Sequence, residues 1–356
     1  MNILHIVQSF DISGRSRVIY ELSSALNKDG FGSWIVSLTD NCRFTVVESN
    51  AECLHLNKKE GLDIPTIVQL IGIIKKDNIS LIHTHGKGAL LYGIIAKKLT
   101  RAKLLVHTVH RSDADIFKHN SLVENLIKSS VDKVVGVSDA ARLSFIRNHN
   151  FPEAKTTTIY NGINISKYAG ATDKVRKGLI IGTVMNFANH KDYDTLILAF
   201  AEVLKIYPDS QLIMIGDGPN APEVKKLVQE KKVAEHVKFL GFRKDVPDLL
   251  KTFDIFVISS HTEGLGLAIL ESMAARVPVV VSYVDGAREA IDDGVSGIFF
   301  QHGDYQGLKD IIISLHTNEQ LYNSLREKGY EWVTSKFSLE KMYEDYKKVY
   351  ESLNKT

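Results

Sequence analysis

Short apolar runs alternate with amphipathic segments along almost the whole chain. The apolar runs have the length and composition of strands, and the segments between them carry apolar residues at helical spacing. Strands that alternate with helices favour parallel sheets covered by helices on both faces. The sequence therefore predicts an α/β chain built on doubly wound parallel sheets.

The expected elements fall into two series. The strands of the first half are Ile3–Val7, Trp34–Leu38, Leu81–His83, Leu104–Val109, Lys133–Val137 and Thr157–Tyr160. Those of the second half are Leu179–Val184, Gln211–Ile215, Val237–Leu240, Ile255–Ile258 and Val279–Val281. The expected helices are Arg17–Leu26, Ile67–Lys76, Ala89–Leu99, Leu122–Ser130, Asp139–Asn148, Tyr193–Ile206, Glu223–Glu230, Leu267–Ala275 and Leu339–Leu353.

A length of 356 residues suits two domains, each large enough for its own core. The segment 161–173 is polar and lacks periodicity, so we expect the domains to cover 1–165 and 166–338. From Asp304 onward only helical patterns occur, and periodicity does not decide which domain the last helix covers. Ligands bind outside the carboxyl ends of strands in such sheets, so two domains suggest a cleft between them.

The bulk composition excludes several classes of protein. A net charge of +2 argues against nucleic-acid binding driven by charge alone. No apolar run reaches about 18 residues, so no membrane span is expected. The N-terminus resembles a first strand and lacks the features of a signal peptide. Without a secretion signal, Cys42 and Cys53 are expected to be reduced thiols of a cytoplasmic protein, although a disulfide between them is an alternative.

The segment His261–Val280 sets two carboxylates, Glu263 and Glu271, on either side of a Gly-Leu-Gly turn. A helix that begins near Gly266 directs unpaired backbone N–H groups at whatever lies in front of it, which favours phosphate. Carboxylates accept hydrogen bonds from sugar hydroxyls, so the combination indicates a nucleotide sugar. The alternative is that both glutamates are ordinary solvated charges.

Two further positions lie at expected strand ends. Gly14 stands ahead of a helix and would let the backbone approach a phosphate, although a simple tight turn explains it equally well. Lys191 follows the strand Leu179–Val184 and would give a diphosphate a mobile positive charge. A solvated lysine at a helix start is the alternative.

Four histidines gather near two expected strand ends, at positions 83, 85, 107 and 110. Their spacing does not match a zinc module, and no cysteine lies nearby, so no metal site is expected. A histidine at a strand end can hydrogen-bond a sugar or phosphate, whereas His83 and His107 fall within strands and suit a structural role.

Basic residues gather at Lys97, Lys98, Arg101 and Lys103, and the first half carries most of the positive charge. Such a run is typical of a solvated helix face. The alternative is peripheral attraction to an anionic membrane surface that holds a lipid-linked acceptor.

Together these motifs resemble retaining glycosyltransferases of family 4, the glycosyl transferases of group 1, over nearly the whole chain. The strongest match is the Glu-x7-Glu segment, and Ile215–Asn220, Phe239–Val246 and Asp285–Phe300 are similar to further family landmarks. The resemblance implies the α/β GT-B architecture, in which two Rossmann-like domains with parallel sheets face each other across a cleft. It also implies that the last helix, within 339–356, returns to the first domain.

The resemblance implies a role for each site residue. Glu271 would bind the ribose hydroxyls, Glu263 would contact the donor sugar, and His110 would lie beside the reaction centre. Lys191 would neutralise the diphosphate, which Gly14 would border. The backbone amides would come from Gly264, Leu265, Gly266 and Leu267.

Two departures from the family pattern affect the donor site. Ser13-Gly14 stands where Gly-Gly is common, and Asn186 stands where an arginine commonly pairs with the phosphate lysine. Asn186 can donate a hydrogen bond but carries no charge, so Lys191 would bear more of the diphosphate charge, or a nearby arginine would substitute. The candidate substitutes are Arg15, Arg243 and Arg288.

The sequence thus predicts an enzyme that moves a sugar from a nucleotide donor, commonly a UDP-sugar, to a hydroxyl of a sugar or lipid-linked acceptor. Configuration would be retained and neither a metal nor another cofactor is expected. Surface polysaccharide or glycolipid synthesis is the expected setting. Two alternatives are a nucleotide-sugar 2-epimerase on the same architecture and a relative that binds the nucleotide without turnover.

Overall fold

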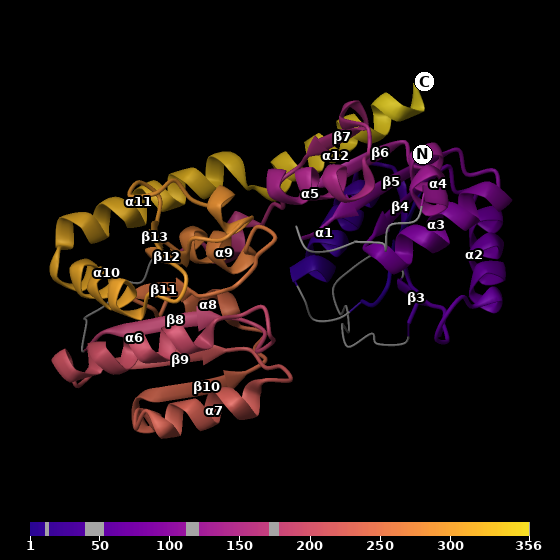
Figure 1. Ribbon diagram of the computed structural model, residues 1–356. Helices are drawn as coiled ribbons and strands as arrows, with labels where there is room; N and C mark the ends of the chain where they lie inside the picture. The colour runs from indigo at the N-terminus through magenta and orange to yellow at the C-terminus, as the bar shows by residue number, and fades with distance from the viewer. Residues whose placement is uncertain (11–13, 40–52, 112–120, 171–177, 356) are drawn as a thin grey trace. The chain divides into compact units, whose positions relative to one another are not determined.

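The computed structural model describes residues 1–10, 14–39, 53–111, 121–170 and 178–355 (Figure 1). The chain forms two compact units. The first comprises Met1–Gly162 and Leu339–Thr356, and the second comprises Ile163–Ser338. Each unit is a parallel sheet packed with helices, which confirms the fold class expected from the alternating sequence pattern.

Among its described residues, the first unit holds a seven-stranded parallel sheet in the order β3-β2-β1-β4-β5-β6-β7. The strands are β1 (Asn2–Val7), β2 (Gly32–Ser37), β3 (Cys53–His55), β4 (Leu81–His85), β5 (Leu104–Val109), β6 (Lys133–Gly136) and β7 (Thr156–Thr158). The helices are α1 (Gly14–Lys28), α2 (Ile64–Lys76), α3 (Lys87–Leu99), α4 (Ser121–Ser130), α5 (Asp139–His149) and α12 (Leu339–Asn354). The strand order reverses between β1 and β4, which is where doubly wound sheets bind ligands.

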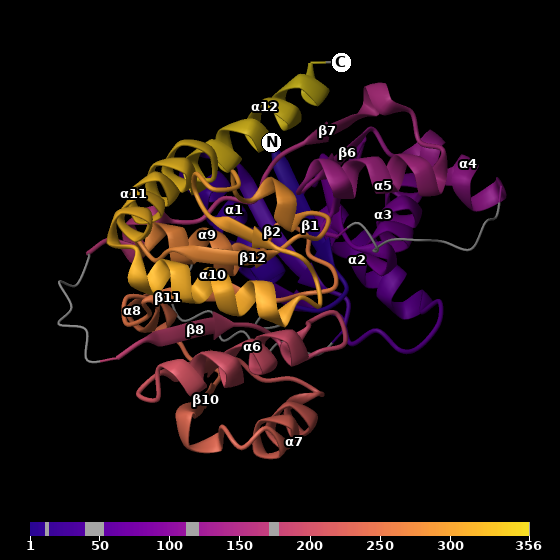
Figure 2. The ribbon, with the colours of Figure 1, turned by 60° about the vertical axis from the view of Figure 1, so that its left-hand side comes forward.

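The two faces of this sheet differ because side chains alternate along each strand. Leu4 and Ile82 point to one face and join an apolar core with residues of α2, α3, α4 and α5. His5 and His83 occupy the alternate positions and pair in register across β1 and β4. Helix α12 covers them, packs beside α1, and hydrogen-bonds through Tyr350 to His83 (Figure 2).

The second unit holds a six-stranded parallel sheet in the order β10-β9-β8-β11-β12-β13 within its described residues. The strands are β8 (Ile180–Val184), β9 (Gln211–Ile215), β10 (Val237–Gly241), β11 (Ile255–Ile258), β12 (Val279–Ser282) and β13 (Ile298–Phe300). The helices are α6 (Tyr193–Ile206), α7 (Ala221–Glu230), α8 (Val246–Leu250), α9 (Leu267–Ala274), α10 (Tyr305–Thr317) and α11 (Glu319–Lys336). Here the order reverses between β8 and β11.

Helices α6, α7 and α10 bury their apolar residues against the second sheet in one contiguous core, and α10 packs beside α6 (Figure 2). Side-chain caps fix several helix starts, because an oxygen of the N-cap residue accepts a hydrogen bond from an otherwise unpaired backbone N–H. Asp192 caps α6 in this way through Thr195 N at 3.1 Å. By contrast, α9 begins at Leu267, and its N-cap residue, Gly266, provides no side-chain cap.

The expected elements are present, with shifts of a few residues at their ends. Strands β3 and β13 were not expected; each has three residues, which is too short for an alternating pattern to register. The chain after Asp304 is helical, as expected. Among the helices of the described residues, none combines the length and the apolar character needed to cross a membrane.

Candidate functional site

The second unit brings Lys191 and Glu263 together at the point where its strand order reverses. Lys191 lies in the loop after β8, Glu263 lies in the loop after β11, and these two strands are neighbours in the sheet. The backbones of Lys191 and Ser260 form an antiparallel bridge, so the two loops run side by side. The carboxyl ends of adjacent parallel strands therefore place both side chains at one edge.

Lys191 and Glu263 form a buried ion pair, with Lys191 8% and Glu263 9% exposed. Lys191 Nζ donates to Glu263 Oε1, and the buried Ser260 completes the cluster. The Ser260 hydroxyl accepts from Lys191 Nζ at 3.2 Å and donates to Glu263 Oε1 at 2.8 Å. Each charge therefore has both an opposite charge and a hydroxyl partner.

The neighbouring strand β12 holds this cluster in place. The Ser282 hydroxyl accepts from Ser260 N at 3.0 Å and donates to Ser260 O at 3.2 Å. In the next loop, Gly286 has a φ of +81°, and a Cβ there would overlap the carbonyl oxygens of Glu263 and Gly264. Glycine is therefore needed for the two loops to pack against each other.

Glu263 is ionised despite its burial. Burial alone raises the pKa of this carboxyl. The charge of Lys191 and the hydrogen bonds from Lys191 and Ser260 lower the pKa by more than burial raises it, and His190 makes a smaller contribution in the same direction. The net result is a pKa below the ordinary value for glutamate. The cluster thus holds one negative and one positive charge in a water-poor site.

The Gly-Leu-Gly turn leads from Glu263 into α9. Leu265 is buried, and Gly266 adopts a φ of +79°, so the chain turns sharply into the helix. The N–H of Ile269 donates to Gly266 O at 2.9 Å, and Gly266 has no side-chain oxygen to cap the two N–H groups before it, so an anion could bind at this helix start. Leu267, the first residue of α9, is half-buried.

Glu271 lies in the second turn of α9 and is only 3% exposed. It has polar or charged partners within the protein. A buried carboxylate on an otherwise apolar helix costs free energy unless its oxygens are hydrogen-bonded. The partners of Glu271 therefore offset part of the cost of burying it.

Asn186 occupies an exposed position in the loop after β8, five residues before Lys191. Backbone hydrogen bonds from Met185 N to Ile215 O and from Phe187 N to Asp217 O tie this loop to the one after β9. Asn186 Oδ1 lies against Gly218, where a Cβ would overlap it. Asn186 is thus held at the strand end but, as expected, brings no charge.

The three arginines considered as substitutes already have partners. Arg243 makes two hydrogen bonds to Asp245, at 2.8 and 2.6 Å. Arg288 lies 4.4 Å from the centre of the Tyr283 ring. Arg15, in the first unit, donates to Ser9 O at 3.3 Å. Lys191 is therefore the basic side chain that the structure places within the Glu263 cluster.

In the first unit, Gly14 begins α1 after β1, whereas Ser13 lies outside the described residues. His110 directly follows β5 and is half-buried. His110 therefore lies at the carboxyl end of a strand, and Gly14 lies at the start of the helix that follows one.

His110 is the outer member of a chain of hydrogen-bonded histidines. His110 Nε2 lies 3.1 Å from His85 Nδ1, and His85 Nε2 lies 3.1 Å from His5 Nδ1. His83, beside them, contacts the Thr108 hydroxyl through Nε2 at 2.7 Å and the Tyr350 hydroxyl through Nδ1 at 2.7 Å. We call His5, His83, His85 and His110 the histidine cluster.

The three inner histidines of the cluster are uncharged. Burial lowers the pKa of His5 to about 3. Burial, together with the neighbouring histidines, lowers the pKa of His83 and of His85 well below the ordinary value. A protonated ring here would lack a compensating negative charge.

One ring nitrogen each from His5, His83 and His85 comes within 4.8 Å of the others, a spacing that could hold a metal ion. However, both nitrogens of His83 contact hydroxyl groups and both nitrogens of His85 contact histidines. A metal would have to break these bonds, and hydroxyl partners are poor support for a metal-ligating ring. These contacts favour the hydrogen-bonded arrangement.

His107 is separate from this cluster. It lies on β5 beside Thr108 and so points to the opposite face, where its Nδ1 lies 2.9 Å from the Thr84 hydroxyl. Its ring contacts Phe145 in the apolar core. His83 and His107 both lie within strands, as expected, but their side chains point to opposite faces of the sheet.

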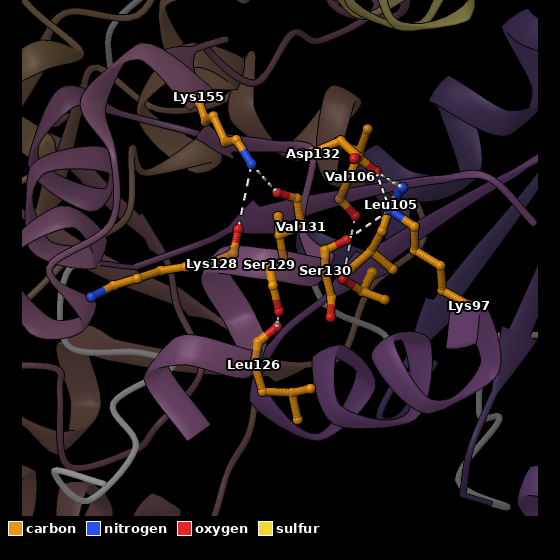
Figure 3. A network of polar contacts seen from close by, with 11 residues as sticks. Lys97, Leu105, Val106, Leu126, Lys128, Ser129, Ser130, Val131, Asp132 and Lys155 are labelled. Atoms are coloured by element: carbon orange, nitrogen blue, oxygen red, sulfur yellow. Dashed lines mark hydrogen bonds and ion pairs between the residues drawn. The ribbon is translucent and has the colours of Figure 1, made fainter. Parts of the chain in front are cut away.

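The basic segment at the end of α3 divides into two parts. Lys97 Nζ donates to Asp132 Oδ2 at 2.5 Å and to Ser130 O at 2.8 Å, so it stabilises the end of α4 (Figure 3). Lys98, Arg101 and Lys103 are exposed. Lys97 thus has a structural role, and the exposed charge is smaller than the sequence suggested.

Sequence reasoning missed several polar residues of these sites. Ser260 follows the apolar strand β11 and Ser282 ends the apolar strand β12, and nothing else in the sequence around them indicates a site. His5 sits inside the first strand and was not considered. A further exposed pair, His261 Nδ1 and His302 Nε2, lies at 2.5 Å, with His302 Nε2 3.5 Å from the buried carboxylate of Asp192.

Known proteins with similar sequences are glycosyltransferases. Residues 165–332 match the family model for glycosyl transferases group 1, and residues 12–167 match that for glycosyltransferase family 4. An uncharacterized glycosyltransferase of Methanocaldococcus jannaschii is 30% identical over 84% of this chain and 84% of its own.

Two relatives have named activities. The N-acetyl-alpha-D-glucosaminyl L-malate synthase of Bacillus anthracis is 26% identical over 81% of this chain and 78% of its own. The UDP-Gal:alpha-D-GlcNAc-diphosphoundecaprenol alpha-1,3-galactosyltransferase of Escherichia coli is 24% identical, over 81% and 79%.

Among solved structures, HepE of Anabaena in complex with UDP-glucose superposes with a TM-score of 0.85. The two sequences are 22% identical, and the match covers 99% of this chain and 100% of the other. The chain belongs to the glycosyl transferases of group 1, family 4, and has their GT-B fold.

Proposed function

We propose that this glycosyltransferase moves a sugar from a nucleotide-sugar donor, a UDP-sugar, to a hydroxyl group of its acceptor with retention of configuration. The observation that carries the proposal is the buried Lys191–Glu263 pair beside the uncapped start of α9. The loops after two neighbouring strands of the second sheet, together with α9, then offer a cation and backbone amides for a diphosphate, and carboxylates for sugar hydroxyls.

The donor would be bound by groups of complementary chemistry. Lys191 and the amides of Gly264, Leu265, Gly266 and Leu267 suit the diphosphate, whereas Glu271 suits the two ribose hydroxyls. Glu263, already ionised, suits a hydroxyl of the transferred sugar. Gly14 would border the diphosphate from the start of α1, and Asn186 would add a neutral hydrogen-bond donor.

The chemical step would depend on stabilising the departing diphosphate. Lys191 forms an ion pair with Glu263. The ammonium group of Lys191 would also stabilise the negative charge that develops on a neighbouring diphosphate as it leaves, so this stabilisation would not need a metal ion. The family resemblance gives His110 a role beside the donor sugar. No pair of side chains is assigned as nucleophile and base.

UDP as the nucleotide is supported by the similarity to HepE in complex with UDP-glucose and to a galactosyltransferase named for UDP-Gal. The acceptors in the relatives' names are L-malate and a lipid diphosphate sugar. We favour a lipid-linked or sugar acceptor in surface polysaccharide or glycolipid synthesis, with the exposed Lys98, Arg101 and Lys103 drawing a cytoplasmic enzyme to an anionic membrane surface.

The decisive experiment screens nucleotide sugars by thermal shift and follows the best donor by NMR with acceptor extracts. The proposed donor should raise the melting temperature by mass action, and transfer should yield a product with the donor's anomeric configuration. Interconversion of the donor without any acceptor would instead identify an epimerase. Binding without transfer to any acceptor would identify a binding protein.

A further inference from the structure

We infer that His85 is a positioning residue for His110: it donates a hydrogen bond from Nδ1 to His110 Nε2 and so fixes the imidazole tautomer at the proposed transfer site. The inference rests on the proposed function for its catalytic meaning. Its structural content, the tautomer of His110, can be measured whether or not the protein transfers a sugar.

Geometry provides the first step. His5, His85 and His110 come from β1, β4 and the residue after β5, and two nitrogen–nitrogen contacts of 3.1 Å join them in a line. Ring centres are 5.4 Å apart for His5 and His85, and 5.3 Å apart for His85 and His110. The line runs from the buried sheet to the strand end.

Counting protons provides the second step. A neutral imidazole carries one N–H, and each of the two contacts needs one proton between its nitrogens. The protons therefore run in one of two directions along the line. In the outward order, His5 donates to His85 and His85 donates to His110. In the inward order, each donation is reversed.

The inner end of the line decides between the two orders. His5 Nε2 is fully buried and has no hydrogen-bond partner among the described residues. The inward order would place a proton on this nitrogen and bury an N–H without an acceptor, whereas the outward order leaves only a lone pair there. Buried N–H groups without an acceptor are the rarer case in proteins, so the outward order is preferred.

The surroundings keep the two inner members of the line neutral. Tyr346 and Tyr350 of α12 pack on the adjacent His83, and burial raises the pKa of both, so neither supplies a negative charge near neutral pH. Burial opposes protonation of His5 and His85. While His110 is neutral, its proton should therefore lie on Nδ1.

The test is the pattern of ring ¹H–¹⁵N couplings in protein labelled with ¹⁵N-histidine, with His110 assigned from the His110→Gln variant. Wild-type His110 should show a protonated Nδ1 and an unprotonated Nε2. In His85→Leu the pattern should average between tautomers. His85→Asn keeps an amide N–H close to the place of Nδ1, so it should restore the wild-type pattern.

His107→Asn is the matched control, because His107 is equally buried on the neighbouring strand but points to the other face; it should leave the His110 pattern unchanged. If transfer is observed, His85→Leu should lower kcat roughly 10-fold with little change in the donor KM, and His85→Asn should recover it. A protonated Nε2 on wild-type His110, or an unchanged pattern in a folded His85→Leu variant, would overturn the inference. Absence of transfer in the wild type would contradict the proposed function alone.

Discussion

Both units bury a polar cluster at the carboxyl ends of the strands where the strand order reverses, but the two clusters solve the problem of burial differently. In the first unit the inner histidines of the cluster are neutral. In the second unit Lys191 and Glu263 stay charged and pair with each other.

The difference follows from the free energy needed to discharge each group. Histidine loses its proton near pH 6.5, so a buried histidine becomes neutral at little cost at pH 7. Lysine and glutamate titrate far from neutrality, and discharging either one alone is expensive, so they pair instead. A neutral cluster can orient a ligand, whereas a charged cluster can also compensate the charge of one.

Lys191→Met should have the largest effect, because it leaves Glu263 buried without its opposite charge. We expect the second unit to lose about 3–5 kcal/mol of unfolding free energy. The chain has two tryptophans, Trp34 in the first unit and Trp332 in the second, so urea unfolding of the Trp34→Phe background reports on the second unit.

Two variants make this result specific. Replacing both partners, Lys191→Met with Glu263→Gln, should recover most of the loss, since no unpaired charge remains. Arg243→Met breaks the exposed pair with Asp245 in the same unit and should cost less than about 1 kcal/mol. Equal losses from Lys191→Met and Arg243→Met would contradict the contrast between buried and exposed charge.

Acidification should weaken the first unit before the second. The folded-state pKa values of His5, His83 and His85 lie below the unfolded value of 6.5, so the unfolded state takes up more protons as the pH falls below about 6.5. Stability is therefore lost on the acid side, by about 1 kcal/mol for each histidine at pH 5.5.

The pKa of Glu263 is also lowered by folding, but its window lies at lower pH: the stability it contributes is present above the unfolded value of 4.5 and is lost only as the pH falls below that value. The free energy of unfolding of the first unit, followed by Trp34 fluorescence in a Trp332→Phe background, should therefore fall between pH 7 and 5.5 because of the histidines. His5→Asn should reduce the slope of this pH dependence. A first unit insensitive to pH over that interval would show that the histidines are charged or accessible.

The two units should also separate donor binding from transfer. Glu271→Ala in the second unit should weaken nucleotide binding about 10- to 100-fold, as expected for losing hydrogen bonds to a charged group. His110→Ala in the first unit should leave nucleotide binding nearly unchanged and mainly slow transfer. Calorimetric titration with the nucleotide and initial rates at saturating donor measure the two effects, and equal, small effects of both variants would refute the site assignment.

Ser282→Ala should produce the smallest effect, because Ser282 reaches the charged cluster only through Ser260. We expect a cost of about 1 kcal/mol in the stability of the second unit and a donor KM raised about 5-fold. Ser23→Ala is the counterpart in the first unit, where Ser23 bonds Ser33 at 2.8 Å. Ser23→Ala should cost a similar amount of stability and leave the donor KM unchanged. If both variants raised the donor KM, Ser282 would have no specific role at the donor site.

The fold class and most elements could be predicted because burial on both faces of a parallel strand leaves a continuous apolar run, as in Ile255–Ile258. Site positions at strand ends, such as Lys191 and His110, followed from the same rule. Short edge strands such as β3 lacked any periodic signal.

Pairings across the sheet could not be predicted. Lys191 and Glu263 are 72 residues apart, and His5 and His85 are 80 apart. Their contacts depend on which strands become neighbours, and alternation of strands and helices does not fix the strand order. The sequence therefore indicated Lys191, Glu263 and His110 as candidate residues, but it indicated neither His5 and Ser260 nor that Lys191 would neutralise Glu263.

The return of α12 to the first unit has a consequence for the order of assembly. Tyr350, which hydrogen-bonds His83, lies 267 residues further along the chain. A ribosome makes the entire second unit before it makes Tyr350, so the second unit can fold during synthesis while the first still lacks its covering helix. The hydrogen bond from Tyr350 to the histidine cluster is thus formed last, after both sheets have been translated.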